Sequence, residues 1–447
     1  MPALSFPILL LTVSLALARP RLWRLRIDHA PAALLGAALT VLVGAVPVDA
    51  LYPTLRVLVY PVVAIVSLMV LTLLAEEAGL FELLALRIAN LAGGDGRRLF
   101  TYLFFAGAAV GSVFTNDAAV LIFTPLVYRL IERVQGDAWT LSTKIPYYFA
   151  VLYVANLVGA FVISNPINLI VASFFAIDFL EYARWMVVPA LVSMVASYVG
   201  LRLYFRRSLP RTYGGHHASI GAANPRFVRV STAVLGVTLL GFFVEPLTGV
   251  PTWAVAASGA ASLLVLSAAM GWAESPKVLK GVGWDVIVFV VGIFVVVSGL
   301  RNAGLTSQIE RLVLYLAGFE VFGLMMVNGL ITAMCSAVMN NHSTAYAVAL
   351  AIEDMPVGWE AGFAGDWGAF YVKRMLVFST LIGGDLGPKM LPIGSLAALL
   401  WFRMLRDRGV EIPYRLYVTI GVPVTLAAVV LSVLALYAEY GIVQLLR

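Results

Sequence analysis

The chain has 447 residues, of which 61% are hydrophobic and only 12% are charged. Soluble domains carry about 45–50% apolar and about 25% charged residues. No water-soluble fold buries this much apolar surface, so the composition excludes secreted, fibrous, disordered and cytosolic-enzyme classes and predicts a polytopic membrane protein. The net charge of +6 comes from basic residues between apolar segments, which excludes a nucleic-acid-binding face. The single cysteine, Cys335, excludes an intramolecular disulfide and a cysteine-cluster metal site.

Ten apolar segments are predicted as membrane helices, because about 20 apolar residues cross a bilayer. They are expected at 4–18, 31–51, 57–75, 145–178, 186–204, 229–248, 252–271, 285–300, 370–402 and 416–437. Two of them are long and contain internal breaks, at Ser164–Pro166 and at Gly383–Pro392. A broken helix in lipid leaves backbone groups that need new partners, so such breaks are expected to line a polar cavity.

Two further apolar segments, 99–131 and 319–352, are interrupted by short polar clusters. The clusters are Thr115–Asp117 and Asn340–His342. We interpret each segment as a re-entrant hairpin whose tip lies inside the membrane. The alternative is a pair of ordinary helices joined by an external loop.

The positions of basic residues predict the orientation, since cytoplasmic loops are rich in Lys and Arg. If the segments cross as predicted, 22 of the 30 Lys and Arg residues fall on one side. We assign that side to the cytoplasm, which places both termini outside. The first apolar segment has its charges after the apolar run, so we expect a retained helix rather than a cleaved signal peptide.

The chain also resembles itself. Residues 77–80 recur at 302–305, Asn116 pairs with Asn340, and Pro166 pairs with Pro388. These similar offsets predict two repeats, 1–204 and 229–447, joined by a cytoplasmic linker at 205–228. The first repeat holds an odd number of crossings, so the second is expected to be inverted, as in many secondary transporters. The predicted fold class is therefore all-α: a polytopic membrane transporter of two inverted repeats, each with a re-entrant hairpin and a broken helix.

The four breaks are expected to converge on one site. Their uncharged polar residues suit a neutral polar solute or a partly dehydrated cation better than a multivalent anion. These residues are Thr115, Asn116, Ser164, Asn165, Asn168, Asn340 and Asn341. No metal site and no cofactor is expected.

Ionisable groups at membrane depth are functional candidates, because burying them is unfavourable. Asp117 is the first choice for carrying a proton, with His342 and Asp385 as the second choices. Asp385 and Lys389 are four residues apart and can share a helix face, which predicts a structural ion pair. For Asp385 the structural role and the proton-carrying role stay open, and His342 could instead only bond the hairpin.

Several runs resemble the arsenical pump membrane protein family of the ArsB type. The most specific is Asp385–Ala397 (DLGPKMLPIGSLA); Thr115–Pro125 (TNDAAVLIFTP), Glu76–Glu82, Leu300–Leu305 and Val338–Asn341 also match, as do Ser164, Asn165 and Asn168. The matches follow the family order from about residue 66 to 403. One departure is His342-Ser343-Thr344, where the family usually has Met-Pro-Thr.

The resemblance implies efflux of trivalent arsenite and antimonite across the bacterial cytoplasmic (inner) membrane, driven by proton antiport or by a partner ATPase subunit. Arsenite at neutral pH is largely the uncharged trihydroxide, which amides and backbone groups can hydrogen-bond. One rival is a sodium–proton or carboxylate transporter of the same superfamily. A second is an intramembrane enzyme, but no His-Glu-x-x-His motif is present. A third is an anion channel whose only engine is the ATPase.

Overall fold

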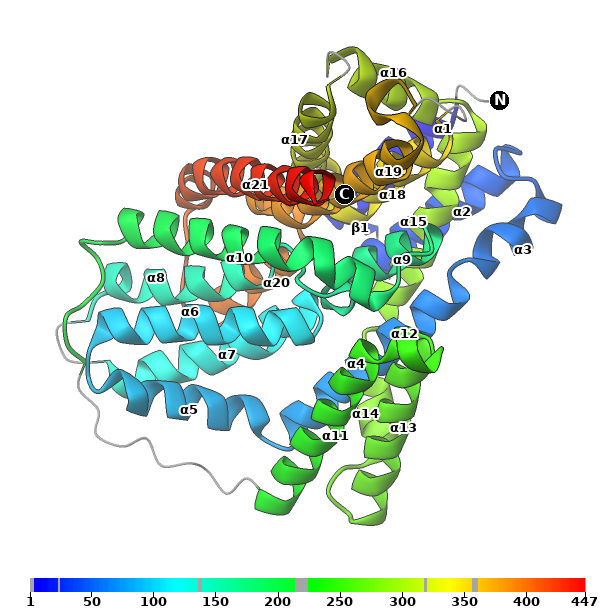
Figure 1. Cartoon of the computed structure of the whole chain (residues 1–447). Coiled ribbons are helices and arrows are strands. Elements are labelled where there is room, and N and C mark those ends of the chain that lie inside the picture. Colours follow the sequence, from blue (N-terminus) through cyan, green and yellow to red (C-terminus); the bar gives the residue numbers. More distant parts are fainter. Residues whose placement is uncertain are drawn as a thin grey trace.

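The computed structural model describes residues 4–22, 25–135, 139–213, 224–316, 320–355 and 361–446, and this part of the chain is almost entirely helical (Figure 1). The sole strands in it are β1 (Arg21–Leu22) and β2 (Leu25–Arg26), which pair antiparallel. The all-α class predicted from the sequence is confirmed.

The described part of the first half contains ten α-helices and the 3₁₀ turn η2. They are α1 (Ser5–Ala18), α2 (His29–Leu42), α3 (Val48–Arg56), α4 (Val59–Glu77), α5 (Leu80–Ala92), α6 (Gly96–Val113), α7 (Asn116–Val134), α8 (Leu141–Val154), η2 (Val162–Ser164), α9 (Pro166–Phe174) and α10 (Phe179–Tyr204).

The second half of the chain runs from α11 to α21. Its elements are α11 (Pro225–Phe243), α12 (Glu245–Thr248), α13 (Thr252–Ala269), α14 (Ser275–Gly281), α15 (Trp284–Asn302), α16 (Thr306–Leu316), α17 (Val321–Met339), α18 (Asn341–Glu353), α19 (Ala361–Leu386), η3 (Gly387–Lys389), η4 (Pro392–Gly394), α20 (Leu396–Arg406) and α21 (Tyr414–Leu445). Helices α10 and α21 pack side by side and run in opposite directions (Figure 1).

Seven described helices are long and apolar enough to cross a bilayer: α4, α10, α11, α13, α15, α17 and α21. Two shorter helices, α1 and α2, are also apolar. Helices α6 and α7 meet at the predicted first polar cluster, and α17 and α18 meet at the second. The two long segments are broken where the sequence predicted, at η2 and at η3–η4.

The single helix predicted at 31–51 is wrong, because the chain turns between α2 and α3. Gly44 has a φ of 71°, a left-handed conformation that glycine adopts without steric penalty. Pro47 then precedes α3 in an extended conformation. Helix α3 buries none of its residues.

The helices α5 and α16 were not expected from the sequence, because both are short and carry charged residues among their apolar ones.

The internal resemblance at 77–80 and 302–305 has a structural cause. Helices α4 and α15 both end there, and the glycines that follow, Gly79 and Gly304, have φ values of 80° and 73°. A left-handed glycine is a common helix terminator. The later landmark needs a correction: Pro166 is the first residue of α9, and the matching first residue of α20 is Leu396. Pro388 lies instead in the separate turn η3.

Helices α2 and α15 pack closely through small residues. A Cβ atom on Gly292 of α15 would lie 2.8 Å from the Ala33 carbonyl carbon of α2. A Cβ on Gly299 would lie 2.5 Å from Cγ2 of Thr40. Without a hydrophobic driving force between helices in lipid, such close approach supplies much of the packing energy.

We therefore expect Gly292→Ala to destabilise the protein by about 1–3 kcal/mol, the usual penalty for overpacking. The obstacle is backbone, so it cannot move aside without shifting α2. The measurement is the thermal unfolding midpoint in detergent. The matched control is Gly236→Ala in α11, where a Cβ would meet nothing within 4 Å; equal midpoints for the two variants would contradict the prediction.

Candidate functional site

Asp385, in the last turn of α19, is the centre of a buried polar cluster. Its side chain is buried, with 1% relative exposure. It accepts hydrogen bonds from the backbone N–H of Gly159 at 2.9 Å, from Asn165 Nδ2 at 2.6 Å and from Asn168 Nδ2 at 3.1 Å. Hydrogen bonds to an ionised group are about twice as strong as neutral ones. The carboxylate of the second half thus holds the interrupted backbone of the first half.

The break in the first half positions these donors. Asn165 is the N-cap of α9, with φ −145°, and its Oδ1 accepts a hydrogen bond from the N–H of Ile167. Pro166 follows at the first helical position, where a missing N–H does no harm. A Cβ on Gly159 would overlap Ser164 Oγ and lie 2.6 Å from Asn168 Nδ2. Glycine at this position lets the backbone N–H reach Asp385.

The break in the second half also depends on close approach. Turns η3 and η4 lie against the hairpin helix α17: a Cβ on Gly387 would overlap the carbonyl oxygen of Ala333. A Cβ on Gly394 would lie 2.8 Å from the carbonyl oxygen of Ala337. Ser395 then caps α20 through its Oγ, as Asn165 caps α9.

Lys389 is buried beside this cluster, with 1% relative exposure. Its Nζ makes no hydrogen bond with any described residue and lies 5.0 Å above the centroid of the Tyr153 ring. The predicted ion pair is therefore not formed by a direct bond between Asp385 and Lys389. The physical reason is that amide donors already occupy the Asp385 oxygens, while the ammonium faces the electron-rich face of a phenol ring.

The second hairpin tip is closed by its own side chains. Asn340 has a φ of 77°, and its Oδ1 accepts a hydrogen bond from the N–H of His342 at 3.0 Å. The ring Nδ1 of His342 lies 2.8 Å from Asn341 Oδ1. The ring also meets Phe289 and Tyr346 edge-on. His342 therefore shapes this tip, and its Nε2 has no partner among the described residues.

The first hairpin tip is formed by Thr115, which precedes α7 in an extended conformation. Its side chain is fully buried, and its Oγ1 has no hydrogen-bond partner in the described part of the chain. Asn116 and Asp117 open α7. The side chains of these two predicted site residues lie outside the described ones.

Tips and breaks adjoin one another. A Cβ on Gly107 of α6 would touch Val154, the last residue of α8. A Cβ on Gly384 would touch both Ile167 of α9 and Ala345 of α18. The fold thus brings Asn165 and Asn168 into direct contact with Asp385, and it packs helices α6 and α18, which adjoin the predicted tips, against α8 and α9.

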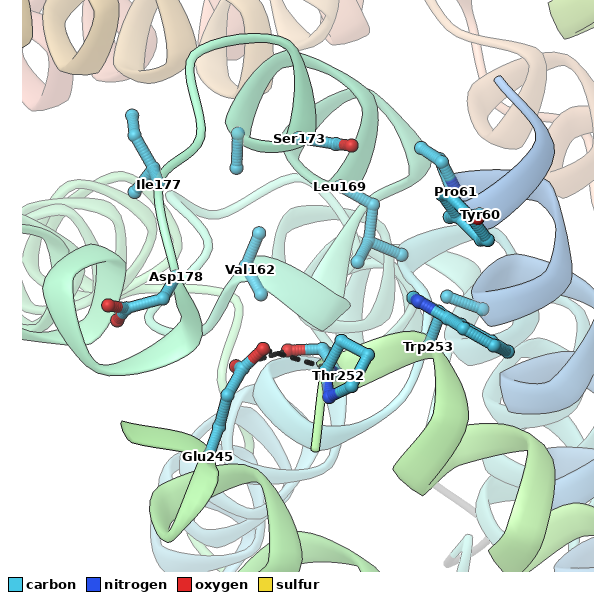
Figure 2. Close-up of a pocket in the computed structure, with 13 residues that line it drawn as sticks. Tyr60, Pro61, Val162, Leu169, Ser173, Ile177, Asp178, Glu245, Thr252 and Trp253 are labelled. Atoms are coloured by element: carbon cyan, nitrogen blue, oxygen red, sulfur yellow. Dashed lines mark hydrogen bonds between the residues drawn. The ribbon is translucent and has the colours of Figure 1, made fainter. Parts of the chain in front are cut away.

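Two cavities flank these elements. The larger, of about 470 Å³, is lined by His29, Met69, Thr72, Leu73, Glu76, Thr115, Leu121, Ile122, Gly281, Val282, Gly283, Asp285, Val286 and Leu400. The smaller, of about 130 Å³, lies between the ends of α4, α9, α12 and α13 (Figure 2).

Sequence reasoning missed Gly159, Tyr153, His29 and Asp285 as parts of these sites. Gly159 follows a helix end within the broken segment, which is a signal for close backbone approach. Asp285 and His29 lie at the starts of apolar helices, where a charged residue ordinarily faces solvent. Their ring and carboxylate come within 3.0 Å only through the packing of α2 on α15.

The arrangement offers neutral amide and hydroxyl groups around one fixed carboxylate. Such groups can replace part of the hydration shell of a small uncharged solute. One thiol, Cys335, is present in the sequence, so a set of three thiolate ligands cannot be assembled. The cluster is suited to reversible hydrogen bonding rather than to tight coordination.

Comparisons with known proteins agree on one family. The family model described as "Arsenical pump membrane protein" matches residues 4–440. A curated protein of that name from Escherichia coli strain K12 is 34% identical over 409 residues, covering 90% of this chain and 92% of its own. Another from Yersinia enterocolitica is 33% identical over 439 residues, covering 97% and 98%.

A solved structure shares the fold. The YdaH transporter of Alcanivorax borkumensis, described as having an unusual topology, aligns with a TM-score of 0.59 at 15% identity, covering 99% of this chain and 98% of that one. Together with the apolar helices, the bacterial relatives make this a multi-pass protein of the bacterial cytoplasmic (inner) membrane. The chain belongs to the arsenical pump membrane protein family.

Proposed function

We propose that this protein is a secondary active exporter of trivalent arsenite and antimonite that is driven by inward proton flow. The observation that carries the proposal is the Asp385 cluster, in which neutral amides from one broken helix surround a buried carboxylate from another. Membership of the arsenical pump family supports the substrate class.

The solute would be held as the neutral trihydroxide. Its hydroxyls can donate to Asn168 Oδ1 and to Thr115 Oγ1, both buried and without a partner among the described residues. The remaining proposed ligands, from the sequence, are Asn116, Ser164, Asn165, Asn340 and Asn341. Ser164 already donates to the carbonyl oxygen of Phe161, so its hydroxyl serves the solute as an acceptor.

Alternating access would rest on the two halves acting as inverted repeats, 1–204 and 229–447, with 205–228 as the linker. Three observations support this assignment. Helices α4 and α15 have the same length, and both of their ends are separated by the same number of residues in the sequence. Helices α10 and α21 run in opposite directions, and similar elements recur in similar order in the two halves. An inverted pair can exchange conformations and thereby open one side or the other. A partner ATPase subunit stays a prediction, with the basic loops at 202–229 and 403–415 as its docking surface.

The two carboxylates are proposed to have different roles. Three donors hold the Asp385 side chain in place, so this carboxyl group is proposed to hold the break together. Asp117, at the start of α7, is therefore the proposed proton carrier. His342 is second, because Asn340 and Asn341 already engage its Nδ1.

We expect Asp117→Asn to abolish arsenite uptake that is driven by a pH gradient in everted vesicles, because an amide cannot release a proton. The variant should keep its thermal unfolding midpoint. The measurement is initial uptake with and without the gradient. Asp49→Asn, in the exposed helix α3, is the matched control; undiminished uptake by Asp117→Asn would remove Asp117 from this role.

Asp385→Asn should lose transport and stability together. The amide cannot accept from all three donors, and an unsatisfied buried polar group costs about 1–3 kcal/mol. A lower unfolding midpoint in detergent, compared with Asp117→Asn, is the measurement. If Asp385→Asn were as stable as the wild type, the anchoring role would be contradicted.

Coupling to protons is separable from coupling to sodium, which the rival transporter class would use. A protonophore is expected to stop arsenite uptake into everted vesicles, whereas replacing sodium with potassium is expected to leave it unchanged. Antimonite should compete with arsenite for uptake. Uptake that followed the sodium gradient would favour the rival.

A further inference from the structure

The larger cavity opens at one end of the helices that surround it. The cavity is lined by Glu76 near the C-terminal end of α4, by residues of 281–285, where α14 gives way to α15, and by Leu400 of α20. Lys277 and Lys280 lie in α14, which ends at the cavity residue Gly281, and Arg403 lies three residues after Leu400 in α20. Basic residues mark the cytoplasmic side, so this end of the cavity lies on the side that the sequence assigns to the cytoplasm.

The cavity also lies between two groups of helices. One wall comes from α2, α4 and α15, where α2 and α15 are closely packed through Gly292 and Gly299. The other wall comes from Thr115, Leu121 and Ile122 of the first hairpin and from Leu400 after the second break. A solute in this cavity would contact both the closely packed helices and the interrupted ones.

The polar groups of the lining are suited to a neutral hydroxy compound. Thr115 Oγ1, at the hairpin tip, is fully buried and has no described partner. At the mouth, Asp285 Oδ2 lies 3.0 Å from His29 Nε2, and the Asp285 side chain is 60% exposed. Glu76 is exposed on the same lining. Carboxylates at the mouth accept hydrogen bonds from hydroxyls and disfavour anions.

The smaller pocket lies at the other end of the same helix α4. Tyr60, Pro61 and Ala64 line it, opposite Leu169 and Val162 (Figure 2). Figure 2 also shows Glu245, which accepts from the N–H and the Oγ1 of Thr252 at 2.9 and 2.7 Å. These bonds fix the turn that carries one wall of the pocket.

A short stretch of α4, apolar except for Ser67, separates the two cavities. The last α4 residue on the smaller pocket is Ala64 and the first on the larger cavity is Met69. At 1.5 Å rise per residue, this is about 7–8 Å along the helix. Within it, Ile65 and Leu68 are buried, at 0% and 3% relative exposure, and belong to the same apolar core as Val162 and Ile163.

We propose that the 470 Å³ cavity is the cytoplasmic entrance site for the neutral arsenic trihydroxide, and that the solute leaves along α4 toward the pocket of Figure 2. This rests on the proposed function and adds its entry route. Glu76 and Thr115 recognise hydroxyls, and Ile65 and Leu68 form the seal that must open for release.

Access is tested by thiol labelling, since the sequence contains one cysteine. In a Cys335→Ser background, Leu73→Cys lies on the cavity and the neighbouring Leu74→Cys is buried and lines neither cavity. A membrane-impermeant methanethiosulfonate should label Leu73→Cys in everted vesicles but not in right-side-out ones. Ser173→Cys, on the smaller pocket, should show the opposite sidedness. Equal labelling of Leu73→Cys and Leu74→Cys would overturn the proposed access.

Recognition is tested by transport kinetics in everted vesicles. Glu76→Gln should raise the KM for arsenite about three- to tenfold, the effect of weakening one hydrogen bond to a charged group, with kcat unchanged. Glu77→Gln is the matched control, because the adjacent carboxylate is exposed and lines neither cavity.

The outcomes separate the two levels of proposal. If the wild type moves arsenite but Glu76→Gln has an unchanged KM, the entrance site is overturned and the exporter function stands. If the wild type moves no arsenite while Leu73→Cys labels from the cytoplasmic side, the cavity opens as described and the arsenical ligand is overturned together with the proposed function.

Discussion

The site depends on the three hydrogen bonds that Asp385 accepts from Gly159, Asn165 and Asn168. Interrupting a membrane helix exposes backbone groups that lipid cannot satisfy. Here one interruption supplies the donors and the end of another helix supplies the acceptor. The two breaks therefore help to satisfy each other. A solute that entered between them would be tied energetically to both halves of the chain.

Glycines make this arrangement sterically possible. At Gly159 a single added carbon would meet Ser164 and Asn168, and at Gly387 it would meet the backbone of Ala333. Both glycines lie within the stretches where helix gives way to turn. The same residue type that allows the close approach also weakens the helix, so interruption and close packing come from one property. The polar cluster can then form without a large void in the apolar core.

Much of this was predictable because apolar length and polar interruption follow from local sequence. The hairpin tips at Thr115 and Asn340 and the breaks at Asn165 and Asp385 were found in this way, and the structure brings Asn165, Asn168 and Asp385 into contact. The hydrogen-bond and ion-pair partners of the buried charged residues were not predictable from the sequence. Asp385 and Lys389 share the spacing of an ion pair, yet donors more than 200 positions away occupy the carboxylate. The same limit applies to His29 and Asp285, which are 256 positions apart in the sequence and meet through helix packing.

A transporter must release its substrate, and this requirement limits how tightly the site can bind it. Each net hydrogen bond contributes about 0.5–1.5 kcal/mol, so a few bonds to a neutral trihydroxide give weak, rapidly reversible binding. Three thiolates would bind arsenic far more tightly and hold it through the transport cycle. A lining of amides and hydroxyls, around a carboxylate whose oxygens already accept hydrogen bonds from the protein, avoids such tight binding. Under the proposed function, the energy for transport would come from the proton gradient, and the binding site would supply only selection.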